Sequence, residues 1–236
     1  MISLDKIKHS YGDKLVLEDL CLNIDDKQLT CLLGSSGSGK TTILRLISGL
    51  ETPLSGSIDI DGNTLAKDGE NIIQASERNI GFIFQDLGLW PHFSVYKNVA
   101  FGLMEQKSSN IEMKVMDMLD YFGIKDQMHK YPHQLSGGQK QLVAIARSLI
   151  LEPKILLMDE PLSNLDVKLK RKILEYIKNL KQKFDLSIIY VTHDHREAFA
   201  IADQIVLMNN GKIEESGSVE QIKSSNNEYV KYFLEY

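Results

Sequence analysis

The stretch GSSGSGKTT, residues 34–42, constrains what this chain can fold into more than any other part of its sequence. It follows a compact apolar run, QLTCLLG, that is typical of a buried parallel strand. It precedes TILRLISGL, which has helical spacing and a glycine stop at Gly49. In a strand–loop–helix of this kind, successive small residues let backbone N–H groups surround phosphate oxygens, and the helix N-terminus points at the same place. A flexible loop at a helix start is the alternative, and both flanking elements disfavour it.

Two residues of this loop and two later carboxylates have the chemistry that a phosphate site needs. Lys40 would bridge the β- and γ-phosphates of a nucleotide, and Thr41 would place its hydroxyl on Mg²⁺. The run ILLMDE, residues 155–160, is an apolar strand that ends in two acids. Asp159 would belong to the Mg²⁺ shell, and Glu160 would act as the base for an attacking water. The loop alone leaves kinase, GTPase and ATPase open, whereas the loop and the acidic pair together strongly indicate a nucleotide site.

Composition and charge narrow the class of protein. Apolar residues make up 43% of the chain and charged residues 25%, as in ordinary soluble globular proteins. The net charge is −5 and the 27 basic residues are scattered, so we expect no nucleic-acid partner. No apolar segment reaches the roughly 18 residues of a membrane span, and the N-terminus lacks a signal-peptide core. These features predict a cytoplasmic protein that associates with a membrane only through a partner.

The two cysteines, Cys21 and Cys31, lie in apolar, strand-like surroundings. A metal pair would need closer spacing or further ligands, and the sequence offers none. We therefore expect both to be small buried side chains in a reducing compartment.

The pattern along the chain predicts one α/β domain with a helical insertion. Alternating residues near 2–7 and in LVLEDLCLNID indicate a small antiparallel sheet at the N-terminus. From about residue 92 to 151 the spacing becomes helical, and strands return at KILLMDE and SIIYVTHD. The run QIVLMNNGKIEESG reads as a hairpin in which Asn210-Gly211 supplies the positive φ angles of a tight turn.

The run LSGGQKQ, residues 135–141, resembles the signature of the ATP-binding cassette (ABC) family. The other motifs follow in the family's order, and the resemblance covers nearly the whole chain, from Tyr11 to His193 and beyond. It implies an α/β fold with a P-loop NTPase (RecA-like) core, an N-terminal antiparallel β subdomain and an inserted α-helical subdomain. On this basis residues 1–236 would form one ABC ATP-binding domain, with the helical insertion at approximately 87–151.

The resemblance implies that the glycine loop binds ATP and that the signature reaches across to the ATP of a partner chain. Ser136 and the glycines after it precede a helix, so they would form a second anion-binding helix start. An N-capped helix with glycines for close packing is the alternative. The implied nucleotide-binding residues in these two motifs are Gly34, Ser35, Ser36, Gly37, Ser38, Gly39, Lys40, Thr41, Thr42, Ser136, Gly137, Gly138 and Gln139.

Further residues match the family's motifs singly. Tyr11 resembles the aromatic that stacks on adenine, and Gln85 resembles the glutamine that binds Mg²⁺ and senses the γ-phosphate. Asp166 in SNLD would cross the dimer interface, and His193 in YVTHD would contact the γ-phosphate. Plain packing is the alternative for Tyr11, and a structural role at a strand end is the alternative for His193.

Together these matches assign three kinds of site. The expected catalytic residues are Lys40, Glu160 and His193. The expected Mg²⁺ ligands are Thr41, Gln85 and Asp159.

Three residues depart from the usual pattern, which in importers often reads LSGGQQQR. Lys140 and Leu142 differ in the signature helix, and Leu142 in place of arginine puts one helix-surface ion pair in doubt. Asn164 stands where alanine is commoner, which could alter communication between the two nucleotide sites.

The resemblance is to importer ATPases for sugars, polyamines, ferric iron and oxyanions. It implies transport driven by ATP, with a second cassette as homodimer partner, transmembrane permease subunits, a solute-binding protein and a place on the cytoplasmic side of the cell membrane. Segment 87–103 would receive a coupling helix in a groove, although core packing is nearly as good an explanation of its apolar residues. Those residues are Trp90, Phe93, Val95 and Tyr96.

Where the sequence ends, at NEYVKYFLEY, many members of that group continue into a regulatory domain, so we expect no regulation through it. Two other functions stay open. One is a soluble ABC ATPase that acts in DNA repair or on ribosomes, although such proteins usually carry coiled-coil or zinc insertions. The other is a small-molecule P-loop kinase, which leaves LSGGQ and His193 unexplained.

Overall fold

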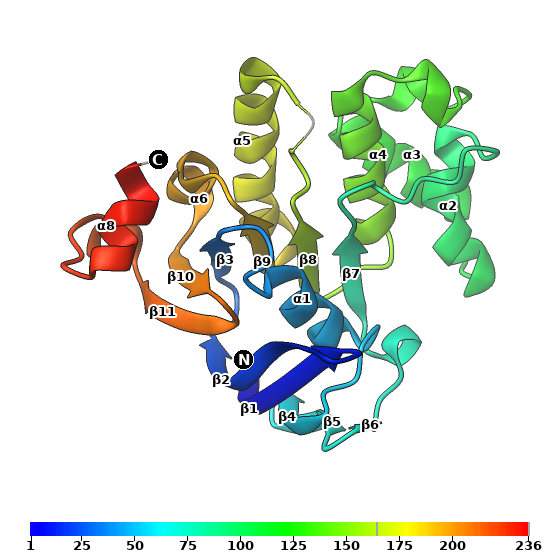
Figure 1. Ribbon diagram of the computed structural model, residues 1–236. Helices are drawn as coiled ribbons and strands as arrows, with labels where there is room; N and C mark the ends of the chain where they lie inside the picture. Colours follow the sequence, from blue (N-terminus) through cyan, green and yellow to red (C-terminus); the bar gives the residue numbers. More distant parts are fainter. Residues whose placement is uncertain (164, 236) are drawn as a thin grey trace.

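The computed structural model describes residues 1–163 and 165–235, and its strands form two sheets (Figure 1). The larger sheet has the order β11-β10-β3-β9-β8-β7 and is parallel except for the edge strand β11. Its strands are β3 (Leu29–Gly34), β7 (Ile80–Ile83), β8 (Ile155–Asp159), β9 (Ser187–Thr192), β10 (Gln204–Asn209) and β11 (Lys212–Gly217). The strands β3, β8 and β9 are buried along their whole length, as parallel strands covered on both faces must be.

The smaller sheet is antiparallel and has the order β2-β1-β4-β5-β6. Its strands are β1 (Ile2–Tyr11), β2 (Lys14–Ile24), β4 (Ser55–Ile60), β5 (Asn63–Lys67) and β6 (Glu70–Asn71). Side chains alternate between its two faces, so Leu20 and Leu22 are buried whereas Cys21 between them is exposed. The prediction that both cysteines are buried is therefore wrong for Cys21 and right for Cys31.

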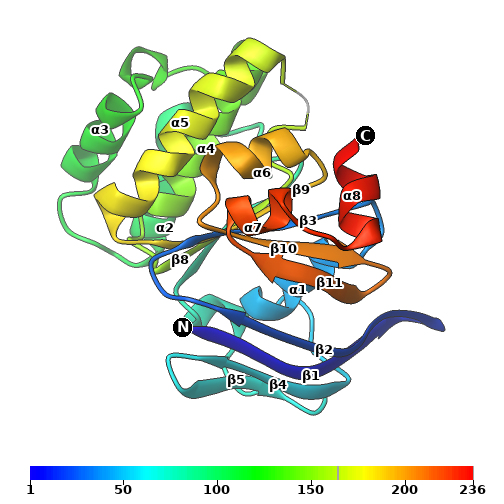
Figure 2. The ribbon, with the colours of Figure 1, turned by 90° about the vertical axis from the view of Figure 1, so that its left-hand side faces the viewer.

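Helix α1 (Lys40–Ser48) lies between the two sheets (Figures 1 and 2). Its apolar side chains share one hydrophobic cluster with the inner face of β1 and β2 and one face of the parallel sheet. Gly49 ends the helix in the left-handed conformation, as the sequence predicts. Helices α5 (Val167–Phe184), α6 (His195–Ile201), α7 (Val219–Lys223) and α8 (Glu228–Glu235) lie toward the other face of the parallel sheet.

Helices α2 (Val95–Glu105), α3 (Ile111–Tyr121) and α4 (Gly137–Leu149) group together beside the parallel sheet, to the right in Figure 1. Short 3₁₀ turns lie at Ala75–Glu77, Lys125–Gln127 and Pro132–Gln134. The buried Asn98 amide donates to three backbone carbonyls between Trp90 and Ser94 and accepts from the Trp90 amide, which fixes this loop. Val95 is fully buried, so its role is core packing, whereas Trp90 is half-buried.

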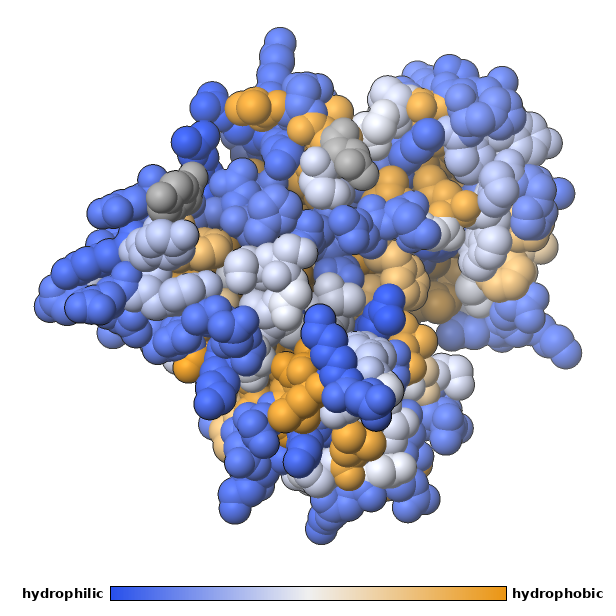
Figure 3. Space-filling view, in the orientation of Figure 1, coloured by the Kyte–Doolittle hydropathy of each residue, from blue (hydrophilic) through white to orange (hydrophobic). Residues whose placement is uncertain are grey.

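The strand register decides which residues meet. Gly34 at the end of β3 lies beside Met208, Leu33 is opposite Thr192 on β9, and Asp159 on β8 is opposite Val191. The carboxyl ends of these parallel strands therefore share one edge, where α/β sheets bind ligands. Among the described residues, no helix is both long and apolar enough to span a membrane. The face in Figure 3 is mainly hydrophilic, with hydrophobic patches that stay separate.

Candidate active site

A cleft of about 990 Å³ opens at this carboxyl edge. It brings together residues that are far apart in the sequence, including Tyr11, the glycine loop, Gln85, Glu160 and His193. The predicted residues that line it are Tyr11, Ser35, Ser36, Gly37, Gly39, Lys40, Thr41, Thr42, Gln85, Glu160 and His193. Gly34, Ser38 and Asp159 do not line the cleft; they are buried and bond to Lys40 or Thr41, which do line it.

The glycine loop turns tightly against the sheet, and two of its glycines are required by the backbone. Gly34 has φ 152° and lies so close to the Met208 carbonyl oxygen that any side chain would clash with it. Gly39 has φ 100° immediately before α1, and a Cβ there would lie 2.7 Å from a Leu17 methyl group. The loop thus presents backbone at the N-terminus of α1, which is the arrangement that binds phosphate.

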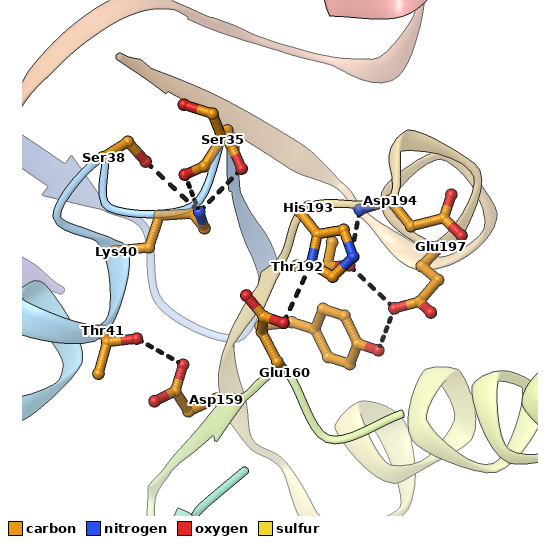
Figure 4. A network of polar contacts seen from close by, with 12 residues as sticks. Ser35, Ser38, Lys40, Thr41, Asp159, Glu160, Thr192, His193, Asp194 and Glu197 are labelled. Atoms are coloured by element: carbon orange, nitrogen blue, oxygen red, sulfur yellow. Dashed lines mark hydrogen bonds and ion pairs between the residues drawn. The ribbon is translucent and has the colours of Figure 1, made fainter. Parts of the chain in front are cut away.

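Lys40 lies across the loop, with its ammonium group against backbone oxygens (Figure 4). Its Nζ donates to the carbonyls of Gly34 at 2.8 Å and Ser35 at 2.7 Å. Burial lowers the pKa of Lys40 from its usual value, while the carboxylates of Glu160 and Asp159 act in the opposite direction. A cation held this way is poised to exchange carbonyl oxygens for phosphate oxygens.

Thr41 and Asp159 meet although they are far apart in the sequence. The Thr41 hydroxyl donates to Asp159 Oδ1 at 2.9 Å, and Gln85 lies on the same cleft. Burial raises the pKa of Asp159, and the hydrogen bond from Thr41 opposes this shift. A hydroxyl, a carboxylate and an amide oxygen are a donor set that fits Mg²⁺, which favours oxygen ligands and completes its shell with substrate phosphates and water.

Glu160 and His193 form a pair at the mouth of the cleft (Figure 4). His193 Nδ1 donates to Glu160 Oε2 at 3.0 Å. Glu160 adopts φ 42°, a conformation that costs a non-glycine residue on the order of 1–3 kcal/mol. The Glu160 amide donates to the Val191 carbonyl at 3.1 Å, which holds this strained residue against β9. Other non-glycine residues such as Leu87 and Glu152 also have a positive φ, so it is the place of Glu160 on the cleft, and not its φ alone, that favours it as the base.

The signature residues lie outside this cleft. The Ser136 hydroxyl accepts from the Gln139 backbone amide at 3.3 Å, and the Gln139 side-chain oxygen accepts from the Ser136 backbone amide at 3.0 Å. These two bonds form a capping box at the start of α4. Gly138 lies close to Leu169, and a Cβ there would come within 2.7 Å of it. Asp166 likewise caps α5 by accepting from the Leu169 amide. The alternative reading of the signature, an N-capped helix with glycines for close packing, thus describes contacts that the structure contains. It does not account for what the exposed Ser136 and Gly137 bind.

A family model described as ABC transporter matches residues 17–163. The chain belongs to the ABC transporter family. A second model, described as an AAA domain, matches residues 131–196. The Fe(3+) ions import ATP-binding protein FbpC of Vibrio cholerae is 44% identical over 94% of this chain, and the spermidine/putrescine import ATP-binding protein PotA of Haemophilus ducreyi is 40% identical over 99% of it.

The chain spans 62% of the length of each of these two ABC relatives. A solved structure, the dimeric post-hydrolysis state of the ATP-binding cassette MJ0796 bound to ADP and Pi, is also similar. It is 29% identical with a TM-score of 0.81, covering 93% of this chain and 99% of that one. The predicted fold, a P-loop core with an antiparallel β sheet and a helical insertion, is therefore confirmed as the ABC cassette fold.

The ABC cassette lines its cleft with some residues that sequence reasoning missed. They are Lys14, Leu15, Val16, Asn210 and Phe233. Of these residues, only Asn210 had a signal in the sequence, as part of the predicted Asn210-Gly211 hairpin turn. In the structure this turn reaches the glycine loop, where the Gly211 amide donates to the Ser38 carbonyl at 3.1 Å. Phe233 comes from α8 near the end of the chain, and nothing local marks it as a site residue.

The departures from the family pattern fall at different places. Leu142 is half-buried against the hydrophobic core, so an apolar side chain fits its position on α4. Asn164 lies outside the described residues.

Replacing Asp159 with asparagine should make the ligand-free cassette more stable and its hydrolysis much slower. The raised pKa means that the fold favours the neutral carboxyl group, so the ionised form present at pH 7 destabilises the protein. We expect the melting temperature to rise by about 2–4 °C at pH 7. This gain should shrink as the pH falls toward the ordinary aspartate pKa of 3.8, because both side chains are then neutral. Calorimetry across pH, with no gain at pH 7, would contradict the prediction.

Proposed function

We propose that this chain is the ATP-binding and ATP-hydrolysing subunit of an importer, in which two cassettes close on ATP and drive transmembrane subunits. The observation that carries the proposal is that Lys40, Thr41, Glu160 and His193 line one cleft, with the buried Asp159 bonded to Thr41. Phosphoryl transfer needs groups that bind the phosphates, the metal ion and the attacking water, and Lys40, the Thr41–Asp159 pair and the Glu160–His193 pair match these three needs in turn.

The hydrolytic step follows from these positions. The loop amides and Lys40 would bind the β- and γ-phosphates, and Thr41, Asp159 and Gln85 would hold Mg²⁺, which neutralises phosphate charge when bound. Glu160 would accept a proton from the attacking water, and His193 would fix the carboxylate and approach the γ-phosphate. Catalysis then rests mainly on positioning and on electrostatic stabilisation.

A second copy of the chain would complete the site. Ser136 and Gly137 are exposed at the N-terminus of α4 and lie outside the chain's own cleft, so a nucleotide in that cleft needs a second chain to meet a signature. Two chains related by a twofold axis would exchange signatures and enclose two nucleotides. The similar cassette of known structure is a dimer with ADP and Pi, which supports this arrangement.

The transport role rests on the importer ATPases named above. One is named for the import of Fe(3+) ions and the other for the import of spermidine and putrescine, at 44% and 40% identity, so sequence similarity does not assign this chain a cargo. We propose permease subunits in the cell membrane and a solute-binding protein as partners that do, with this chain on the cytoplasmic side.

Two measurements test the proposal. Phosphate release should depend on ATP and Mg²⁺, with water as the acceptor; transfer of phosphate to a small molecule would instead indicate a kinase. The tagged native protein should be recovered from mildly solubilised membranes with multi-span subunits, as identified by mass spectrometry. Recovery with ribosomes or DNA, together with good ATPase activity, would favour the soluble ABC ATPases.

Replacing Tyr11 with alanine should raise the KM for ATP with little change in kcat. Tyr11 is 41% exposed on the cleft, and its ring lies edge-on to the buried His9 ring with centroids 4.9 Å apart. Loss of one stacking partner corresponds to roughly a three- to tenfold change in KM. Tyr11→Phe keeps the ring and should behave like the parent. Equal KM values for the alanine variant and the parent would assign Tyr11 to packing.

A further inference from the structure

A buried carboxylate lies behind His193, and the hydrolytic step described above does not use it. Glu197 on α6 is only 5% exposed, yet it makes three side-chain bonds. Its Oε2 accepts from the Tyr190 hydroxyl at 2.8 Å and the Thr192 hydroxyl at 3.0 Å. Its Oε1 accepts from Lys170 Nζ at 2.7 Å. These three bonds hold the Glu197 carboxylate in one orientation, because rotating it would break at least one of them.

The bond from Thr192 belongs to a chain of contacts that fixes the backbone on both sides of His193. Thr192 precedes the histidine, and its hydroxyl also accepts from the amide of Asp194, which follows the histidine, at 3.0 Å. Figure 4 shows this chain of contacts from Glu197 through Thr192 to Asp194, with the His193 ring beside it. Glu197 therefore holds the short segment from which His193 reaches Glu160.

The third bond joins this segment to a different part of the molecule. Lys170 lies in the first turns of α5, and its amide donates to the carbonyl of Asp166, the residue that caps the helix. The start of α5 directly follows Asp166, which we expect to lie at the interface with the second cassette. A shift of this helix start would move Lys170 and would pull on Glu197.

We infer that Glu197 is a positioning residue for His193, and that Lys170 couples the start of α5 to it. This inference rests on the proposed function, because it concerns how fast the cleft hydrolyses ATP once the nucleotide is bound. Neither residue lines the cleft, so neither should affect the affinity for ATP.

The test compares two lysines on the same helix. Lys181 also lies on α5, also pairs with a carboxylate, Asp203, and its side chain is 22% exposed against 21% for Lys170. Lys170→Met should lower kcat by roughly tenfold or more without a change in KM for ATP, because a displaced catalytic group costs rate rather than binding. Lys170→Arg should restore most of the rate. Lys181→Met should keep the parental kcat.

The same substitutions are then made in a His193→Ala background, where single-turnover release of labelled phosphate measures the residual rate. If Lys170 and Glu197 act through His193, Lys170→Met and Glu197→Gln should cause no further loss there. An equal loss in both backgrounds would show a merely structural role and would overturn the inference. So would a Lys170→Met protein with the parental kcat. A parent protein that binds and hydrolyses no ATP would instead overturn the proposed function, and the inference with it.

Discussion

Replacing Glu160 with glutamine should lower the rate of ATP hydrolysis by about 10²- to 10³-fold while nucleotide binding is kept. Glutamine preserves the size and the hydrogen bond to His193 but cannot accept a proton from water. In the proposed cycle hydrolysis reopens the two cassettes, so the variant should accumulate as an ATP-bound dimer, and size-exclusion chromatography with ATP and Mg²⁺ would detect it.

The chain supplies a matched control for this substitution. Glu152 is also a glutamate with a positive φ, 53°, but it is exposed and does not line the cleft. Glu152→Gln should hydrolyse ATP at the parental rate and stay monomeric in solution when ATP is consumed. Normal hydrolysis by Glu160→Gln would show that another group is the base.

Replacing Ser136 with aspartate should abolish hydrolysis without unfolding α4. Aspartate caps helices about as well as serine, so the capping-box contact to the Gln139 amide can be kept. Its negative charge would repel a phosphate brought to the helix start by a partner chain. A pure capping role for Ser136 would therefore predict full activity, whereas an anion-binding role predicts almost none. Circular dichroism and phosphate release measure the two consequences separately.

Mixing variants then tests whether the site is shared. Ser136→Asp and Lys40→Ala proteins should each be inactive alone, but an equal mixture should recover about a quarter of the parental activity. Half of the randomly formed dimers are mixed, and each mixed dimer has one intact loop facing one intact signature. Activity no greater than the sum of the separate proteins would contradict a shared site.

Ser218 provides the control for these experiments. It caps α7 through the same kind of capping box, with the Gln221 amide donating to its hydroxyl at 3.3 Å, and it does not line the cleft. Ser218→Asp should be fully active, and its mixture with Lys40→Ala should show no rescue beyond the activity of the Ser218→Asp protein itself.

The sequence determined the parts of this protein that depend on local backbone chemistry. The loop at 34–42, the stop at Gly49 and the turn at Asn210-Gly211 each need conformations that few residues adopt, so small residues at fixed spacing reveal them. Apolar runs such as 155–159 likewise indicate buried strands, because only strands covered on both faces tolerate continuous apolar side chains.

Only the tertiary structure decided which of these parts meet. The strand order brings Asp159 to Thr41 and Glu160 to His193, and no local pattern encodes that order. It also decided that Cys21 faces outward, because a strand's period of two outweighs the apolar character of its neighbours. The tertiary structure likewise decided the bonds of Glu197 and the place of Phe233 on the cleft, since both arise between elements that meet only after folding.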